Sequence, residues 1–427
     1  MDIFEKLESN VRSYCRTFPD KFRAAKGASV YSYTGKRYID FFAGAGALNY
    51  GHNHPIIKEK IIEYIESDGI VHSLDMYTEA KEHFLHKFHA TILAEDRYPY
   101  KIQFCGPTGT NAVEAAIKLA RKVTNRSGVF AFRGSYHGMS LGSLSVTSNL
   151  FHRQAAGVPL SNVSFFPFPG DIYNIDSISY IEKILADDHS GEDKPAAIIL
   201  ETIQAEGGVN VAPIEWLQAL SNLCKQHEIL LICDDVQVGC GRSGSFFSFA
   251  EADIVPDIVI LSKSISGYGL PMALLLIKEQ YDIWLPGEHN GTFRGNQLAI
   301  VAATAALELW EADGFQKEIV VKSLVTSSAL DRCNLIHKDI QIRGKGMIWG
   351  IDFGALGDTH IAIEIRNRCF EQGLMVECAG RQDTVIKLLP PLTIEIELLQ
   401  QGCEILLDSA SIAIGNNVGY PMTNNSR

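Results

Sequence analysis

Residues 229–237 read ILLICDDVQ, a short apolar run that ends in two carboxylates. The run at 229–233 predicts a strand buried on both faces of a sheet. Further strands are predicted at residues 101–105, 129–132, 163–168, 196–200 and 258–261, with amphipathic helices at 111–124 and 213–227. Short strands that alternate with helices from about residue 75 to 305 are typical of a mostly parallel sheet. The sequence therefore predicts an α/β fold.

Both ends of the chain carry shorter elements outside this core. A hairpin is predicted near the N-terminus, and a second α/β unit beyond about residue 310. The elements expected there are strands at residues 30–33, 37–42, 347–353 and 385–389, a loop at 43–47 and a helix at 361–372. Residues 416–427 hold four asparagines and little apolar content, which predicts a disordered tail.

The charge and composition of the chain exclude several classes of protein. Its 427 residues include 38 basic and 50 acidic side chains, a formal net charge of −12, which argues against a nucleic-acid or anionic-membrane partner. No apolar run is long enough for a membrane span, and the first residues lack the features of a signal peptide. Nine cysteines without a CxxC pair indicate reduced thiols rather than disulfides or a zinc site. We therefore expect a cytoplasmic protein without a metal.

Polar residues follow three of the predicted strands, at the edge where open α/β sheets bind ligands. Residues 107–111 read PTGTN and open a helix whose free N–H groups suit a phosphate, although threonine and asparagine also cap ordinary helices. Asp234 follows a buried run, where a carboxylate needs a cationic partner, either a ligand or a structural ion pair. Lys263 follows another apolar strand, where desolvation would lower its pKa, unless it is a surface lysine in a loop.

These three features together match one cofactor. Pyridoxal phosphate requires a lysine for its covalent attachment, an acid at its pyridinium nitrogen and a cradle for its phosphate. The acid keeps the ring nitrogen protonated, so that the ring can accept electrons from a substrate carbanion. Lys263, Asp234 and residues 107–111 supply one of these groups each.

Four motifs carry a resemblance to a known family. They are ETIQAEGG at 201–208, DDVQVG at 234–239, Lys263, and HNGTFRGN at 289–296. In order and spacing they resemble the successive motifs of the class III (ω-amino) pyridoxal-phosphate aminotransferases, over about residues 15 to 410. The stretches most similar to the diaminobutyrate–2-oxoglutarate branch of that family are residues 41–52, 106–121, 262–272 and 286–296.

The resemblance implies a fold and a domain organisation. The fold is the type I fold of pyridoxal-phosphate-dependent transferases, with a mostly parallel, seven-stranded sheet in a large cofactor-binding domain. A small α/β domain is formed from both ends of the chain. On this basis we expect the large domain at residues 75–310 and the two parts of the small domain at 1–74 and 311–415.

The resemblance also implies the roles of the residues around the cofactor ring. Lys263 would hold the cofactor covalently and, once freed, would move the proton between substrate and cofactor carbons. Asp234 would pair with the pyridinium nitrogen, and Gln237 would reach the phenolic oxygen. Tyr136 would stack on the ring. His137, which follows Tyr136, keeps a structural interpretation.

The phosphate contacts implied by the resemblance come from two subunits. Gly109 and Thr110 would donate to the phosphate from the same chain. Thr292 would add a contact from the neighbouring subunit, so a homodimer is the smallest expected assembly, and a larger homo-oligomer is left open.

Substrate recognition is expected to involve Glu206 and Lys387. Glu206 matches a position that, in some members of the family, alternates between an arginine partner and the substrate. The family arginine is replaced here by Lys387, which keeps the charge but loses the fork that grips a carboxylate in bidentate fashion. Ala205 stands where the family generally has glycine, and its Cβ adds a methyl group near the cofactor.

The reaction implied by the resemblance transfers an amino group between two small-molecule substrates. The amino group of L-glutamate would pass to L-aspartate 4-semialdehyde, giving L-2,4-diaminobutyrate and 2-oxoglutarate. Three alternatives stay open: another ω-amino acid transaminase, acting on ornithine, 4-aminobutyrate or a similar donor; an aminomutase or decarboxylase; and a non-catalytic protein with the same fold. The residues do not decide whether the product feeds a compatible solute or a siderophore.

Overall fold

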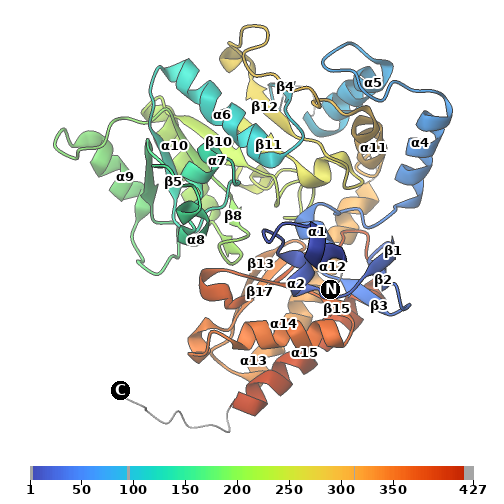
Figure 1. Cartoon of the computed structure of the whole chain (residues 1–427). Coiled ribbons are helices and arrows are strands. Elements are labelled where there is room, and N and C mark those ends of the chain that lie inside the picture. The colour runs from blue at the N-terminus through green and yellow to red at the C-terminus, as the bar shows by residue number, and fades with distance from the viewer. Residues whose placement is uncertain (1–2, 94–96, 312, 418–427) are drawn as a thin grey trace.

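The computed structural model describes residues 3–93, 97–311 and 313–417. At its centre is a seven-stranded sheet in the order β4-β12-β11-β10-β7-β5-β6 (Figure 1). Its strands are β4 (Tyr100–Phe104), β5 (Val129–Phe132), β6 (Val163–Phe166), β7 (Ala197–Leu200), β10 (Leu230–Asp234), β11 (Ile258–Leu261) and β12 (Leu274–Lys278). Within this sheet only β12 runs antiparallel to its neighbours, β11 and β4. The predicted mostly parallel sheet is confirmed.

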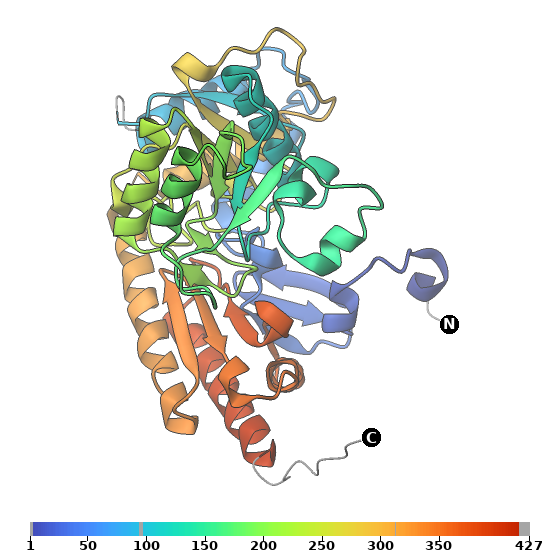
Figure 2. The ribbon, with the colours of Figure 1, turned by 90° about the vertical axis from the view of Figure 1, so that its left-hand side faces the viewer.

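Helices cover both faces of the large sheet (Figure 2). Successive side chains of a strand point to opposite faces, so the apolar strands contribute side chains to two hydrophobic cores, one on each face of the sheet. Leu231 packs in the core cluster that contains the apolar face of α10 (Ile214–Gln226). Ile232 packs in the cluster that contains the alanine-rich face of α6 (Gly109–Thr124). This double burial explains why the inner strands β5, β7, β10 and β11 are continuous apolar runs rather than alternating patterns, whereas the edge strands β4 and β6 include polar residues.

The elements predicted for the large sheet are present, with ends that differ by at most two residues. One strand was not predicted: β12 returns antiparallel beside β11 without an intervening long helix. The segment between them therefore lacks the helical periodicity that marks a crossover between parallel strands.

Strands from both ends of the chain form the smaller sheets, whose orders are β1-β2-β3-β15 and β13-β14-β17-β16. β3 (Arg37–Asp40) pairs in parallel with β15 (Leu374–Met375), so N-terminal and C-terminal segments share a sheet, on the same side of the large sheet in Figure 1. The predicted hairpin is confirmed as the antiparallel pair of β2 and β3. The other strands are β1 (Phe22–Lys26), β2 (Ser29–Ser32), β13 (Gln341–Lys345), β14 (Ile348–Asp352), β16 (Glu377–Ala379) and β17 (Val385–Leu388).

The remaining elements complete the described part of the chain. They are the helices α1 (Ile3–Leu7), α2 (Tyr14–Thr17), α3 (Ala43–Gly46), α4 (Pro55–Glu66), α5 (Glu79–Phe88), α7 (Leu141–Val146), α8 (Leu150–Gln154), α9 (Ser177–Ala186), α11 (Gln297–Glu308), α12 (Asp313–Leu330), α13 (Cys333–Ile336), α14 (Ile361–Glu371) and α15 (Ile396–Asn417), a π-helical turn at His89–Leu93, short 3-10 helices at Ala250–Ala252, Lys263–Ser266, Glu279–Tyr281, Gly354–Leu356 and Arg381–Asp383, and the short hairpin of β8 (Ile203–Gln204) and β9 (Asn210–Val211). The predicted tail began at residue 416, but α15 continues through Asn417; residues 418–427 lie outside the described ranges.

The segment predicted as a loop at 43–47 is a tight turn in the left-handed region. Ala43 has φ 47°, Gly44 60° and Ala45 55°. Side chains with a Cβ are disfavoured there, and such conformations are kept only where surrounding contacts impose them. The contacts of this turn with the strand ends are described below.

Two general features bear on the class of protein. Over the described residues, no helix combines the length and the apolar character that crossing a membrane requires. All nine cysteines are unpaired, and seven of them are buried.

Candidate active site

Three ionisable side chains meet at the carboxyl ends of neighbouring strands. Asp234 is the last residue of β10, Lys263 follows β11, and Glu201 follows β7. These strands lie side by side and run parallel, so their ends share one edge of the sheet. Of the three, Asp234 and Lys263 were predicted, and Glu201 was not.

Lys263 is held by the left-handed turn near the N-terminus. Its Nζ donates a hydrogen bond of 2.8 Å to the carbonyl oxygen of Ala45, and the next residue, Ser264, donates through Oγ to the carbonyl of Gly46 over 2.7 Å. Lys263 itself has φ 51°, in the left-handed region. Burial lowers the pKa of Lys263, against the opposing effect of the nearby Glu206 carboxylate. The amine is therefore closer to its neutral, nucleophilic form than a surface lysine.

Asp234 is buried, and His137 is its partner. Nδ1 of His137 lies 2.7 Å from Oδ2 of Asp234, and the N–H of Val236 donates to Oδ1 over 3.1 Å. The ring of His137 is fully buried, and its Nε2 has no hydrogen-bond partner within the described ranges. The structural interpretation of His137 gains a specific contact: this ring orients the carboxylate of Asp234.

The N-terminus of α6 forms a cradle beside these residues. Thr108 caps the helix by accepting from the N–H of Asn111, and the backbone N–H groups of Gly109 and Thr110 have no acceptor among the described residues. A Cβ on Gly109 would lie 3.2 Å from Cγ1 of Val236, so the cradle has no room for a side chain. Free N–H groups at a helix N-terminus suit a phosphate.

The residues at this edge fit pyridoxal phosphate. A lysine whose pKa is lowered, a buried carboxylate and an open phosphate cradle are the three groups that this cofactor needs, and they converge here. The carboxylate of Asp234 has no lysine or arginine partner among the described residues, so a cationic ring nitrogen would complete its environment.

Tyr136 contacts the same edge of the sheet through Glu201. Its backbone N–H donates to Oε2 of Glu201 over 3.0 Å. Burial raises the pKa of Tyr136, as do the carboxylates of Glu206 and Glu201. Burial also raises the pKa of Glu201 well above its ordinary value. Glu201 is the first residue of a recognised motif, but its burial was visible only in the fold.

The second half of the site is a cluster around Lys387 on β17. This lysine is fully buried, and its Nζ lies 2.6 Å from Oε1 of Glu206, 3.0 Å from Oε1 of Glu377 and 3.1 Å from Oε1 of Gln237. The amide of Gln237 also donates to Glu206 and to the carbonyl of Ala45, each over 3.1 Å. Glu206 and Lys387, both predicted, are thus brought together, and Gln237 joins them in the same network.

One residue of this cluster was not predicted. Glu377 is buried, and burial raises its pKa to about 7, although Lys387 opposes this effect. It stands in no motif, because it belongs to β16 and reaches the site only through the pairing of β16 with β17.

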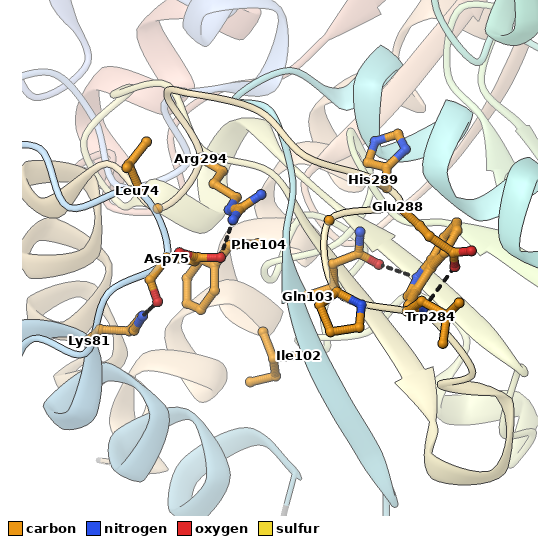
Figure 3. Close-up of a pocket in the computed structure, with 14 residues that line it drawn as sticks. Leu74, Asp75, Lys81, Ile102, Gln103, Phe104, Trp284, Glu288, His289 and Arg294 are labelled. Atoms are coloured by element: carbon orange, nitrogen blue, oxygen red, sulfur yellow. Dashed lines mark hydrogen bonds and ion pairs between the residues drawn. The ribbon is translucent and has the colours of Figure 1, made fainter.

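Thr292 is not brought to this site. It is exposed, and its hydroxyl makes no hydrogen bond to other described residues. The segment that carries it borders a cavity of about 370 Å³, lined by Trp284, His289, Arg294, Asp75 and Gln103 among others (Figure 3). None of the residues around Lys263 or Lys387 lines this cavity.

A family model and bacterial relatives match almost the whole chain. The family model described as aminotransferase class-III matches residues 15–409. A diaminobutyrate–2-oxoglutarate transaminase of Virgibacillus pantothenticus is 53% identical over 409 residues, which cover 95% of this chain and 98% of that protein. A protein of the same name from Bordetella parapertussis is 50% identical over 420 residues, 97% of this chain and 96% of the other.

Solved structures share the fold. The ornithine aminotransferase of Toxoplasma gondii superposes with a TM-score of 0.82 at 24% identity, over 97% of this chain and 94% of that one. An amine transaminase from an uncultivated Pseudomonas species, in its PLP-bound form, has a TM-score of 0.83 at 22% identity, over 97% and 99% of the two chains. Identity at this level shows the fold alone.

Proposed function

This chain belongs to the class-III aminotransferases, which use pyridoxal phosphate, and from that membership we propose that it transfers the amino group of L-glutamate to L-aspartate 4-semialdehyde. The products are L-2,4-diaminobutyrate and 2-oxoglutarate. Relatives that share about half of their residues with this chain carry the name of that reaction. The observation that carries the proposal is the convergence of Lys263, Asp234 and the α6 cradle at one sheet edge.

We assign the chemistry of the site to a small number of side chains. When bound, pyridoxal phosphate supplies an electron sink for the bond that breaks at the substrate carbon. Asp234, oriented by His137, keeps the proton on the ring nitrogen. Lys263, whose pKa burial lowers, takes and returns the proton at its Nζ. Gly109 and Thr110 would hold the phosphate, Tyr136 would contact the ring, and Gln237 would contact the phenolic oxygen.

The cluster of Glu206 and Lys387 supports the choice of substrates. Glutamate and 2-oxoglutarate carry two carboxylates, and a buried cation is a fitting contact for one of them. Lys387 is paired with Glu206 in the structure, so a substrate carboxylate must compete with a carboxylate of the protein. This arrangement favours weak retention of 2-oxoglutarate, which suits a reaction that must release it.

We infer that the active unit is a homodimer in which Thr292 serves the phosphate cradle of the partner. The inference is supported by apolar side chains exposed near the Thr292 segment: Phe293 at 67%, Leu285 at 64%, Leu74 at 45% and Tyr77 at 100% exposure. An exposed apolar surface of this kind marks an interaction site.

We further propose that residues 1–74 and 311–415 act as one small domain on a large domain of residues 75–310. The parallel pairing of β3 with β15 supports this division. A cytoplasmic location is proposed from the nine unpaired cysteines.

Half-reactions followed by the absorbance of the bound cofactor test the function. L-glutamate alone should convert the purified holoenzyme to its aminated form and release one equivalent of 2-oxoglutarate, and aspartate 4-semialdehyde should then reverse the spectrum with formation of diaminobutyrate. Without a spectral change on addition of glutamate, the transaminase proposal is wrong. An aminomutase or decarboxylase would release no 2-oxoglutarate. Equal or faster turnover with ornithine or 4-aminobutyrate would assign the enzyme to another ω-amino donor.

A further inference from the structure

Glu377 is a buried carboxylate to which the proposed function gives no role. It lies on β16 directly opposite Lys387 of β17, as its register partner in an antiparallel pair. Nζ of Lys387 is 3.0 Å from Oε1 of Glu377, and the glutamate side chain is only 9% exposed. The contact is an ion pair without a directed hydrogen bond, since Oε1 finds no hydrogen-bond partner within the described part of the chain. Because the backbone fixes cross-strand neighbours, this pair is part of the sheet itself.

Glu206 reaches the same ammonium group from the short hairpin that follows β7 of the large sheet. It stands at the tip of the β8–β9 hairpin, where its carbonyl oxygen accepts the N–H of Gly380 over 2.9 Å, so its backbone is anchored. Its side chain remains 32% exposed. A carboxylate that keeps contact with solvent can turn away from Lys387 at little desolvation cost, whereas Glu377 cannot. The side chain of Glu206 can therefore leave Lys387, whereas that of Glu377 stays beside it.

The charges of the cluster differ in the two arrangements. With Glu206 in place, two carboxylates surround one ammonium group. Burial opposes ionisation of both, but Lys387 and Lys263 lower the pKa of Glu206 to about 2, while the pKa of Glu377 is raised to about 7. When Glu206 turns away, Glu377 still faces Lys387. An incoming substrate carboxylate then meets a partly neutralised lysine instead of a free cation.

We propose that Glu377 is a specificity-determining residue that acts through Lys387, because it positions the ammonium group and weakens its attraction for the carboxylates of glutamate and 2-oxoglutarate. The inference rests on the proposed function, since it concerns the donor and product named there. Diaminobutyrate has one carboxylate where glutamate has two. Its binding therefore gains less when the attraction of Lys387 for carboxylates increases. Glu377 therefore shifts the balance of the site away from the dicarboxylate and toward the diamino acid.

Binding of glutarate to the holoenzyme tests this directly. Glutarate carries two carboxylates but has no amino or keto group, so it binds without reacting, and its Kd can be measured by isothermal titration calorimetry. Glu377→Gln removes the charge with little change of shape and should lower the Kd about tenfold, as expected when a close counter-charge is lost from a largely desolvated contact. The KM for glutamate should fall in parallel, and the KM for diaminobutyrate in the reverse reaction should stay the same or rise.

Two variants separate charge from structure. Glu377→Asp keeps the charge and should keep the Kd of glutarate close to the wild-type value. Glu371→Gln removes a charge from the exposed end of α14 and should change nothing. A glutarate Kd that is unchanged or higher in Glu377→Gln would overturn the proposal. An equal fall in the KM for glutamate and in the KM for diaminobutyrate would also overturn it. If the wild-type enzyme turned over neither glutamate nor diaminobutyrate, the proposed function would fail instead, while the glutarate measurement would still report on Glu377.

Discussion

Nδ1 of His137 lies 2.7 Å from the carboxylate of Asp234, and both side chains are buried. An ionised carboxylate can only accept, so the ring nitrogen donates and fixes the plane of the acid. The other ring nitrogen makes no hydrogen bond within the described ranges. The single polar contact of this ring is therefore the one that orients the acid of the active site.

Replacement of His137 by phenylalanine should slow the enzyme without unfolding it. An aromatic ring is kept, and the only side-chain hydrogen bond lost is the one to Asp234. We expect kcat to fall about 10- to 100-fold, the usual effect of removing a group that orients a catalytic residue. His189→Phe, at an exposed position, is the control. A normal kcat in His137→Phe would show that the acid needs no orienting partner.

Asp234→Asn should be more severe than loss of His137. A neutral amide cannot hold the proton on a pyridine nitrogen, so the ring loses its ability to accept electrons. We expect kcat to fall by at least about a thousandfold. A steady-state assay with glutamate and the semialdehyde measures the loss, and a nearly normal rate would mean that a different acid serves the ring.

Lys263→Ala should abolish turnover and covalent attachment together. Treatment of the wild-type holoenzyme with borohydride followed by mass spectrometry should show a chain that carries the cofactor, and the variant should show the bare chain. Lys58→Ala, at an exposed position on α4, should behave as wild type. Cofactor trapped on the variant chain would assign the attachment to another lysine.

Gly109→Ala should weaken cofactor binding. The new Cβ would lie 3.2 and 3.3 Å from the two Cγ atoms of Val236, so the start of α6 must shift and the cradle with it. We expect the Kd for pyridoxal phosphate, titrated into the apoenzyme, to rise about tenfold. Val236→Ala in the same chain should restore binding, since it removes the colliding atoms. Gly314→Ala, which meets no atom within 4 Å, is the neutral control.

Asp235 should make the fold less stable as the pH rises. Burial raises the pKa of its carboxyl from 3.8 to about 7, against the hydrogen bonds from Ser248. A carboxyl whose pKa is higher in the folded chain binds more protons there, so its contribution is full below about pH 4 and is lost as the pH rises to about 7. Between pH 5 and 8 the loss is roughly 3 kcal/mol. Urea unfolding at both pH values should show a fall in the free energy of unfolding that is smaller in Asp235→Asn than in the wild type by about this amount.

The sequence was sufficient for the large sheet and for the cofactor edge. The predicted inner strands β5, β7, β10 and β11 are continuous apolar runs because both of their faces are buried, and Asp234 and Lys263 stand at the ends of two such runs. The information is local, since residues a few positions apart define both the strand and its functional end.

The substrate side was less accessible to sequence reasoning. Glu377 reaches Lys387 through the pairing of β16 with β17, and Glu206 reaches the same lysine from a hairpin far away in the chain. The antiparallel strand β12 was not predicted, because no long helix separates it from β11 as a helix separates parallel strands. The left-handed turn at residues 43–46 was predicted only as a loop, because its conformation depends on contacts with Lys263 and Ser264.

The pairing of β3 with β15 also bears on how the protein is made. During synthesis, residues 37–40 leave the ribosome long before their partners, residues 374–375, exist. The strands of the large sheet are all translated in between. The large sheet can therefore form while β3 of the first hairpin has no partner along its outer edge. An unpaired edge invites association with other chains. A nascent chain stalled before residue 374 should therefore need chaperone protection at its N-terminal hairpin, and a chain released in full should not.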